Sequence, residues 1–246
     1  MARFPVLSAL SVVAAFAQTP PATFEVASIR PHAAQGDAGS ESSNTNVLPG
    51  GRRSCSNVNV RKLLRNAFQV EDWGMIGAPG WVDSASYDIE AKTTGGVAIT
   101  RDNIQQLLES LLVSRFQLQY HRETREATVF ALEVAKGPAK LKPATADEAA
   151  SMSMNSTQGT MTLHAAKISM KDFAATLARQ TGRPVMDETG LAGEFDFDLI
   201  WSRDQAADAT APSVFAALQG LGLRLVSGKG QVGIIAIDRV ERPSEN

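Results

Sequence analysis

Histidine and acidic side chains are the groups in this 246-residue chain that could hold a metal or transfer protons. The three histidines are His32, His121 and His164, and no two of them have the i, i+4 spacing that places zinc ligands on one helix face. The spacing therefore predicts neither a metal site nor a bound cofactor. A zinc site assembled from distant segments is the alternative.

Acidic residues are densest between positions 187 and 198, where their spacing is that of a strand. Asp196 and Asp198 alternate with apolar residues, as Asp88 and Glu90 do earlier in the chain. Alternation at period two puts such residues on the solvent face of a half-buried strand. Because two segments share this feature, we interpret it as part of the scaffold. Acid–base catalysis by Asp88, Asp196 or Asp198 is the alternative.

The remaining motifs give no catalytic centre. Residues 228–233 match the pattern G-x-G-x-x-G, but they lie between two predicted strands, so we interpret them as a hairpin turn and not as a dinucleotide-binding loop. Cys55 is the only cysteine, and Ala165 stands at the corresponding place of a repeat described below, which favours a packing role. No residue is therefore predicted to be catalytic; a Ser-His-Asp triad assembled from distant segments is an open alternative.

Two stretches of the chain, residues 57–134 and 167–240, have the same predicted order of elements. Each begins with an amphipathic helix after a capping residue, Asn59 or Ser169, whose side chain can accept a hydrogen bond from a first-turn amide. A half-buried strand, a second helix and a closing hairpin follow in both stretches. The hairpin turns are predicted near residues 121–126 and 228–230.

This repeat predicts an α+β fold of two related lobes, each with two helices packed on a small mixed or antiparallel sheet. The first lobe is expected at residues 24–143 and the second at residues 160–242. Residues 144–159 lack apolar periodicity and are expected to form a linker, and residues 35–51 are expected to form a long loop. Internal duplication is the origin that we infer for the two lobes.

The N-terminus has the pattern of an export signal. Residues 1–17 combine a basic residue, a short apolar run and a small-x-small ending, and the run is shorter than the roughly 20 residues of a membrane span. We expect an exported protein, in the periplasm or outside the cell, with no stable membrane span after signal cleavage; an uncleaved anchor is the alternative. The formal net charge of −2 does not indicate nucleic-acid binding.

Six further segments extend over most of the expected mature chain: residues 24–31, 77–81, 87–92, 115–116, 121–126 and 237–246. Together they resemble a family of exported, soil-associated proteins of unknown function that is expanded in acidobacteria, and this resemblance implies no catalytic residues. Each lobe, the second more closely, is also similar to the short N-terminal domain of secretins and TonB-dependent receptors, through residues 168–173, 180–182, 190–195 and 222–225. The second resemblance implies docking between envelope proteins.

These observations favour a non-catalytic interaction or sensing module of the cell envelope, whose partner would be an envelope protein or a peptide. The expected contact surface combines the loop at Gly80 and Trp81 with a charged hairpin near Arg122 and Arg125. Two alternatives stay open: a secreted hydrolase that uses acidic residues, and a protein that binds a small ligand in the groove between the lobes. The sequence does not indicate the oligomeric state.

Overall fold

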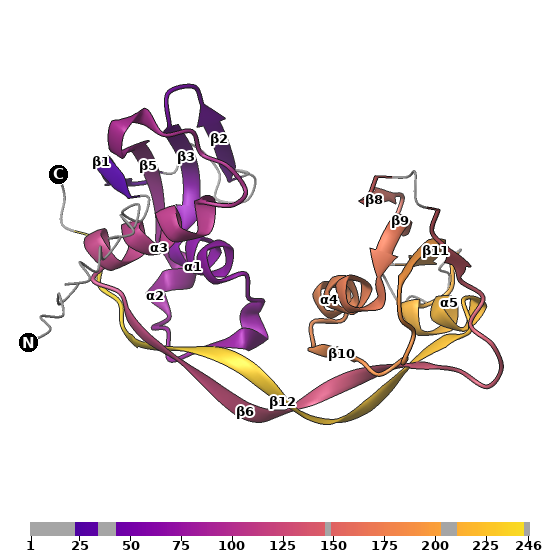
Figure 1. Cartoon of the computed structure of the whole chain (residues 1–246). Helices are drawn as coiled ribbons and strands as arrows, with labels where there is room; N and C mark the ends of the chain where they lie inside the picture. Colours follow the sequence, from indigo (N-terminus) through magenta and orange to yellow (C-terminus); the bar gives the residue numbers. More distant parts are fainter. Residues whose placement is uncertain (1–22, 34–42, 146–148, 203–210, 244–246) are drawn as a thin grey trace, which may run out of the picture.

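The computed structural model describes residues 23–33, 43–145, 149–202 and 211–243. The predicted export signal, residues 1–17, lies outside the described residues. Within these ranges the chain has the predicted α+β composition, with five α-helices and three four-stranded sheets. Figure 1 shows two lobes, each with helices and an outer sheet, connected by a long two-stranded ribbon.

The outer sheet of the first lobe has the order β1-β5-β3-β2, and all of its neighbouring strands are antiparallel. The two main helices, α1 and α3, contribute buried leucines to one core with the inner face of this sheet. The elements of this lobe are β1 (Phe24–Pro31), β2 (Asn44–Leu48), β3 (Arg52–Asn59), α1 (Val60–Phe68), α2 (Trp81–Ser84), β5 (Ser86–Thr93) and α3 (Ile104–Arg115).

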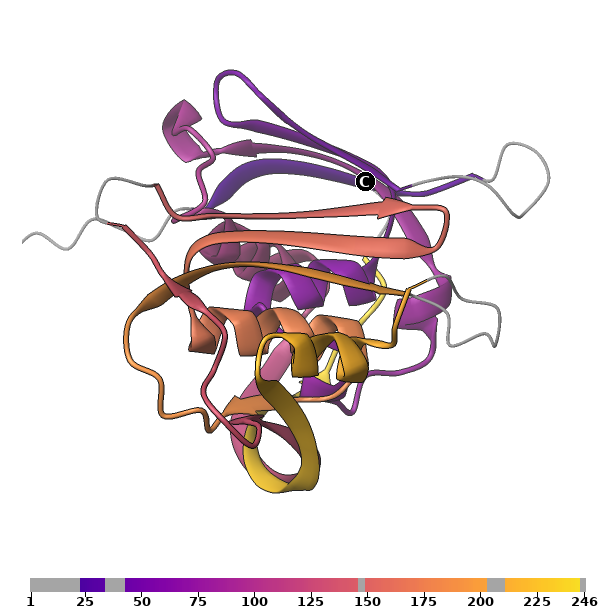
Figure 2. The ribbon, with the colours of Figure 1, turned by 90° about the vertical axis from the view of Figure 1, so that its right-hand side faces the viewer.

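The outer sheet of the second lobe has the order β7-β11-β9-β8 and is also antiparallel. Figure 2 shows that α4 and α5 lie between this sheet and the ribbon. Phe173, Leu177 and Leu218 of these helices are buried in the second core. The elements are β7 (Lys142–Pro143), β8 (Ser151–Thr157), β9 (Thr160–Ser169), α4 (Met170–Thr181), β11 (Glu194–Ser202) and α5 (Val214–Gly220).

The third sheet is the ribbon that joins the lobes, with the order β10-β6-β12-β4. Its two long strands are antiparallel from the pair Leu223 and Val134 to the pair Arg239 and Gln119. The short strands β4 and β10 add parallel edges, β4 to β12 and β10 to β6. The bounds are β4 (Met75–Ile76), β6 (Gln119–Val134), β10 (Val185–Asp187) and β12 (Leu223–Arg239).

The two closing hairpins predicted from the sequence are wrong. Residues 121–126 and 228–230 lie inside the continuous strands β6 and β12, which pair with each other. Gly228 and Gly230 have no positive φ, so they do not turn the chain. The middle of a two-stranded ribbon is open to solvent on both faces, so polar residues can continue through it without ending the strand.

The predicted helix caps are confirmed. The side chain of Asn59 accepts a hydrogen bond from the backbone N–H of Lys62 (2.9 Å), and Ser169 Oγ accepts one from the N–H of Asp172 (3.1 Å). At the other end, α1 and α4 stop at a left-handed residue, which is Gly182 in α4. Local sequence therefore sets both ends of these helices.

Each core includes residues of a strand that lies outside the range expected for its lobe. Ile235 and Ile237 of β12 belong to the first core together with Val240, whereas Leu132 of β6 belongs to the second. The two cores thus cross the expected lobe ranges of 24–143 and 160–242.

Two segments that were expected to lack regular structure contain edge strands. β8 lies within the expected linker at residues 144–159, and β2 lies within the expected loop at residues 35–51. Each of these strands forms a hairpin with the strand that precedes the first helix of its lobe. The sequence did not indicate β2 and β8 because most of their residues are polar, and an edge strand needs to bury little apolar surface.

Gly77 provides a test of the close approach between β4 and β12. It has a φ of +77°, and a Cβ on it would lie 2.5 Å from the backbone oxygen of Ile237. We expect Gly77→Ala to lower the free energy of unfolding by at least about 2 kcal/mol, because the left-handed conformation and the clash both oppose a side chain. Urea denaturation of the purified protein measures this.

Gly80→Ala is the matched control, because Gly80 has a φ of −57° and nothing lies within 4 Å of its added Cβ. Its effect should stay within about 0.5 kcal/mol. Equal effects of the two substitutions would contradict the described approach of β4 to β12.

Candidate functional site

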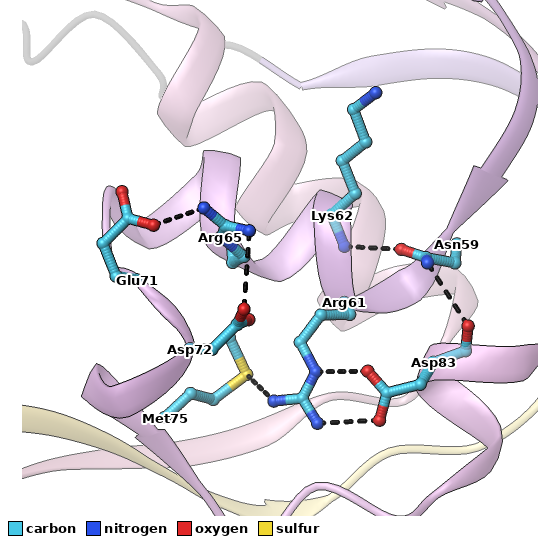
Figure 3. A network of polar contacts seen from close by, with 8 residues as sticks. All are labelled: Asn59, Arg61, Lys62, Arg65, Glu71, Asp72, Met75 and Asp83. Carbon is cyan, nitrogen blue, oxygen red and sulfur yellow. Dashed lines mark hydrogen bonds and ion pairs between the residues drawn. The ribbon is translucent and has the colours of Figure 1, made fainter. Parts of the chain in front are cut away.

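A cavity of about 820 Å³ opens on the solvent-facing side of α1. Three of its residues, Arg61, Lys62 and Arg65, are cations of α1, and that helix contains no acidic residue. Figure 3 shows how these side chains lie relative to their neighbours. The lining residues are Asn59, Arg61, Lys62, Arg65, Asn66, Asp72, Met75 and Asp83.

Arg61 is neutralised within the protein. Its Nε and Nη2 atoms donate to the two carboxylate oxygens of Asp83 at 2.6 and 2.9 Å, which is the bidentate geometry that suits guanidinium and carboxylate groups. The hydrogen bond to Asp83 raises the pKa of Arg61, although burial opposes it, and the same bond lowers the pKa of Asp83. This pair ties α1 to the end of α2 and leaves little charge for a ligand.

Arg65 is neutralised in a similar way. Its Nη2 donates to a carboxylate oxygen of Glu71, and its Nη1 lies 3.6 Å from Oδ2 of Asp72. Both acids follow α1 in the chain, so this network holds the segment between α1 and β4 against the helix. The main role of Arg61 and Arg65 is therefore structural, because each holds a neighbouring segment against α1.

Lys62 is different from its two neighbours. Its side chain is exposed and extends away from both ion pairs, as Figure 3 shows. Its Nζ donates to Ser43 Oγ at 2.5 Å, immediately before β2 begins, and the described part of the chain gives it no acidic partner. Among the described residues, this ammonium group has no counter-charge, and it is held where α1 meets the edge of β2. We call β2, Ser43 and the cavity-lining residues of α1 the β2–α1 site.

The β2–α1 site can recognise a carboxylate or another anion by a charge-assisted hydrogen bond from Lys62. The two nearby arginines are already paired with acidic residues of the protein. Among the described residues, no group of three or more His, Cys, Asp or Glu side chains could hold a metal ion. The arrangement is suited to binding a charged group and contains no paired acid and base around a vacant position.

Three of the four residues expected to form a contact surface have an intramolecular side-chain partner. The Arg242 guanidinium lies 5.2 Å from the centre of the half-buried Trp81 ring, at the start of α2 next to Gly80. The guanidinium carbon of Arg122 lies 5.9 Å from the centre of the Phe68 ring. Arg125 forms an ion pair with Glu123, with 2.6 Å between Nε and Oε1. In the described residues no hydrogen bond, ion pair or ring contact joins Trp81 to Arg122 or Arg125. A binding role for Gly80, Trp81, Arg122 and Arg125 stays a prediction.

The acidic residues considered for catalysis have structural hydrogen bonds. Asp88 Oδ1 accepts from the N–H of Asn57 at 3.0 Å, and Asp196 Oδ1 accepts from the N–H of Lys167 at 2.8 Å. Asn57 and Lys167 have positive φ values of 53° and 55° and form bulges before α1 and α4. Each carboxylate therefore stabilises an irregular backbone that feeds the chain into a helix.

Each of the three histidines lies beside an aspartate of a neighbouring strand or strand end. The hydrogen bond to Asp238 raises the pKa of the exposed His121. These pairs join adjacent strands on the sheet surfaces and explain why the histidines are scattered along the sequence. The Nδ1 to carboxylate distances are 2.8 Å for His32 and Asp88, 3.0 Å for His121 and Asp238, and 2.6 Å for His164 and Asp198.

Sequence reasoning did not find the β2–α1 site. The available signal was the run of Arg61, Lys62 and Arg65 on a helix without acids, but such a run is usually a solvated helix face. What distinguishes Lys62 is that no described residue supplies it with a counter-charge, and that it lies beside a sheet edge. Both depend on residues that are distant in the sequence.

Comparison with models of protein families shows which family the chain belongs to. Residues 61–240 match the family model DUF3738, described as a protein of unknown function, and the chain belongs to this family. No curated protein and no solved structure matches the chain. Among the described residues, no helix is both long enough and apolar enough to cross a membrane.

The bulge at Asp88 predicts a pH-dependent contribution to stability. Burial raises the pKa of Asp88, but hydrogen bonds from Asn57, His32 and Ser56 together bring it below its ordinary value. A folded-state pKa below the unfolded one means that the carboxylate stabilises the fold above the unfolded pKa, and that this contribution is lost as pH falls through the folded pKa. Asp88→Asn should cost roughly 1 kcal/mol at neutral pH, a small value because the side chain is 44% exposed.

Chemical denaturation of both proteins from about pH 6 to about pH 2 measures this contribution. The difference between wild type and Asp88→Asn should shrink toward zero in acid. A difference that stays constant with pH would show that the charge of Asp88 does not support the bulge.

Proposed function

We propose that this protein is a non-catalytic binding module of the cell envelope that holds an extended, acidic segment of a partner protein. The segment adds as a further strand to the free edge of β2, and one of its carboxylates contacts Lys62. The observation that carries this proposal is the difference between the two edges of each outer sheet. Strand addition is a common mode of peptide recognition, in which backbone hydrogen bonds give affinity and side-chain contacts give specificity.

One edge of each outer sheet is protected against further pairing. β1 contains Glu25, Arg30 and Pro31, and β7 is only two residues long, Lys142 and Pro143. Charged residues, prolines and short length are the features by which proteins block strand edges. β1 therefore covers this edge of the first sheet, whereas β7 covers only Phe195 and Asp196 of β11 in the second sheet.

The opposite edges lack this protection. β2 (Asn44–Leu48) and β8 (Ser151–Thr157) contain no charged residue and no proline, and neither has a second neighbouring strand among the described residues. Val47 and Leu48 also expose apolar side chains. An open edge with exposed apolar residues is a hazard unless it has a partner, which supports a role in binding.

Lys62 supports an acidic partner at β2 in particular. In the aligned repeats, Asp172 of α4 stands where Lys62 stands in α1, so the two lobes have opposite charges at the same helical position. A segment carrying a carboxylate complements α1 and would be repelled at α4. The edge of β8 is expected to prefer a different partner.

We also infer that the protein is exported and that its lobes arose by internal duplication. Export rests on the composition of residues 1–17, which supplies a signal-like pattern. Support for duplication comes from the matching strand orders β1-β5-β3-β2 and β7-β11-β9-β8, and from the bulges at Asn57 and Lys167 that precede capped helices in both lobes.

A synthetic peptide test addresses the proposed function. An eight-residue peptide of alternating valine and glutamate should bind and slow amide hydrogen exchange at the backbone of Asn44–Leu48. Lys62→Glu should weaken this binding about tenfold or more, because it replaces attraction by repulsion. Glutamate is tolerated at the third helical position, so the variant should fold.

Lys171→Glu, which makes the same charge change in the first turn of α4, should leave the affinity unchanged. A peptide of alternating valine and lysine serves as the chemical control and should bind weakly. Equal binding of the glutamate and lysine peptides, or unchanged exchange in β2, would reject the proposed function.

A further inference from the structure

We propose that the second lobe binds a planar aromatic acid in a pocket beside the end of α4. A cavity of about 300 Å³ opens there, at the lower end of the usual size of small-molecule sites. Its walls include Phe130 of β6, Trp201 of β11, and Val214 and Phe215 of α5, with Arg183 at the rim after α4. This site lies in the other lobe from the β2–α1 site and does not depend on the function proposed above.

The walls of this pocket are preorganised for a flat ring. Phe130 and Phe215 form an edge-to-face pair, with ring centres 5.5 Å apart and an interplanar angle of 69°. Trp201 is only 4% exposed, so its indole is fixed by the second core. A further aromatic ring in the cavity would meet both faces and edges of rings that are already held in place, which favours aromatic over saturated ligands.

Arg183 provides the charge that such a ligand should complement. Its guanidinium carbon lies 5.3 Å from the centre of the Phe130 ring, and its side chain is exposed. The N–H of Phe130 donates to the carbonyl of Pro184 at 2.8 Å, which fixes the backbone next to Arg183. In the described part of the chain Arg183 makes no ion pair, so a carboxylate on the ligand would supply its counter-charge.

A structural role explains only part of this arrangement. Arg183 follows the cap residue Gly182, and a cation near the C-terminus of α4 interacts favourably with the helix dipole. That role needs a charge, but it needs neither the adjacent cavity nor the aromatic walls. The combination of a ring-lined cavity with a cation at its rim is the feature that indicates an aromatic acid.

The first lobe lacks the same combination. There, the parallel pairing of β4 with β12 corresponds to the pairing of β10 with β6. Ile235 and Trp73 stand at the places of Phe130 and Arg183, so the phenyl ring and the cation are both replaced at these two positions. The shared architecture can therefore form without these two residues, and their presence is specific to the second lobe.

Titration of the full chain with phenylacetate tests this pocket. Phenylacetate should shift the indole N–H resonance of Trp201 in a saturable manner. Phenylacetamide, which has the same ring without the charge, should bind about tenfold more weakly, and cyclohexylacetate should also bind more weakly because its ring is not flat. Arg183→Gln should reduce the affinity for phenylacetate to that for phenylacetamide.

Two further variants separate recognition from folding. Arg179→Gln removes another exposed arginine, about one turn earlier on α4, and should leave the affinity unchanged. Val214→Trp should fill the cavity and abolish binding without removing the charge. The thermal unfolding midpoint of each variant should stay close to that of the wild type.

The source of the aromatic acid can be identified in the same titration. The tripeptide Gly-Gly-Phe with a free carboxyl group presents the same ring and charge as phenylacetate. Tighter binding of the tripeptide would indicate the C-terminus of a peptide as ligand, and weaker binding would indicate a free small acid. Equal affinity for phenylacetate and phenylacetamide, no saturable shift, or equal loss in Arg179→Gln and Arg183→Gln would overturn the proposal.

Discussion

The pairing of β6 with β12 is the interaction on which the rest of the structure depends. These strands are separated by most of the second half of the chain, yet they pair from one end to the other and connect the lobes (Figure 1). Their ends also complete the cores, since Ile235 and Ile237 of β12 are buried in the first lobe and Leu132 of β6 in the second. The second core lies within one continuous stretch, from Leu132 to Leu225, whereas the first core needs residues of β12 that are more than 100 positions away from the rest of it. The folding of the first lobe therefore requires the arrival of a distant strand.

This constraint explains where the polar chemistry lies. The ribbon and the helices close one face of each outer sheet, while the solvent faces carry His–Asp pairs and the bulge-stabilising carboxylates of Asp88 and Asp196. In the part of the chain that the structure describes, β2 and β8 each have one strand edge without a neighbour. The two lobes differ at these positions: within the described ranges, the first has a cation with no acidic partner beside β2, and the second has a pocket with aromatic walls. This difference between the surfaces of the two lobes supports the binding role that we propose.

The sequence predicted the features that depend on neighbouring residues. The caps Asn59 and Ser169, the amphipathic helices α1 and α4, and the alternating strands β5 and β11 are all where the local pattern placed them. It failed for β6 and β12, because alternating polar and apolar residues look the same in one long strand as in a hairpin, and only the distant partner decides between them. The sequence did not indicate the β2–α1 site or the aromatic pocket for a related reason. Lys62 and Arg183 differ from other surface cations only in the counter-charges and cavities that tertiary structure gives them.

The most direct test of this account is the folding of residues 24–143 expressed alone. This segment contains every helix of the first lobe but lacks β12, and therefore lacks Ile235 and Ile237 of its core. We expect it to show no cooperative unfolding transition and poorly dispersed amide resonances, and to recover both when a peptide of residues 231–243 is added. A segment that unfolds cooperatively without this peptide, as stably as the full chain, would contradict the central role of the β6–β12 ribbon.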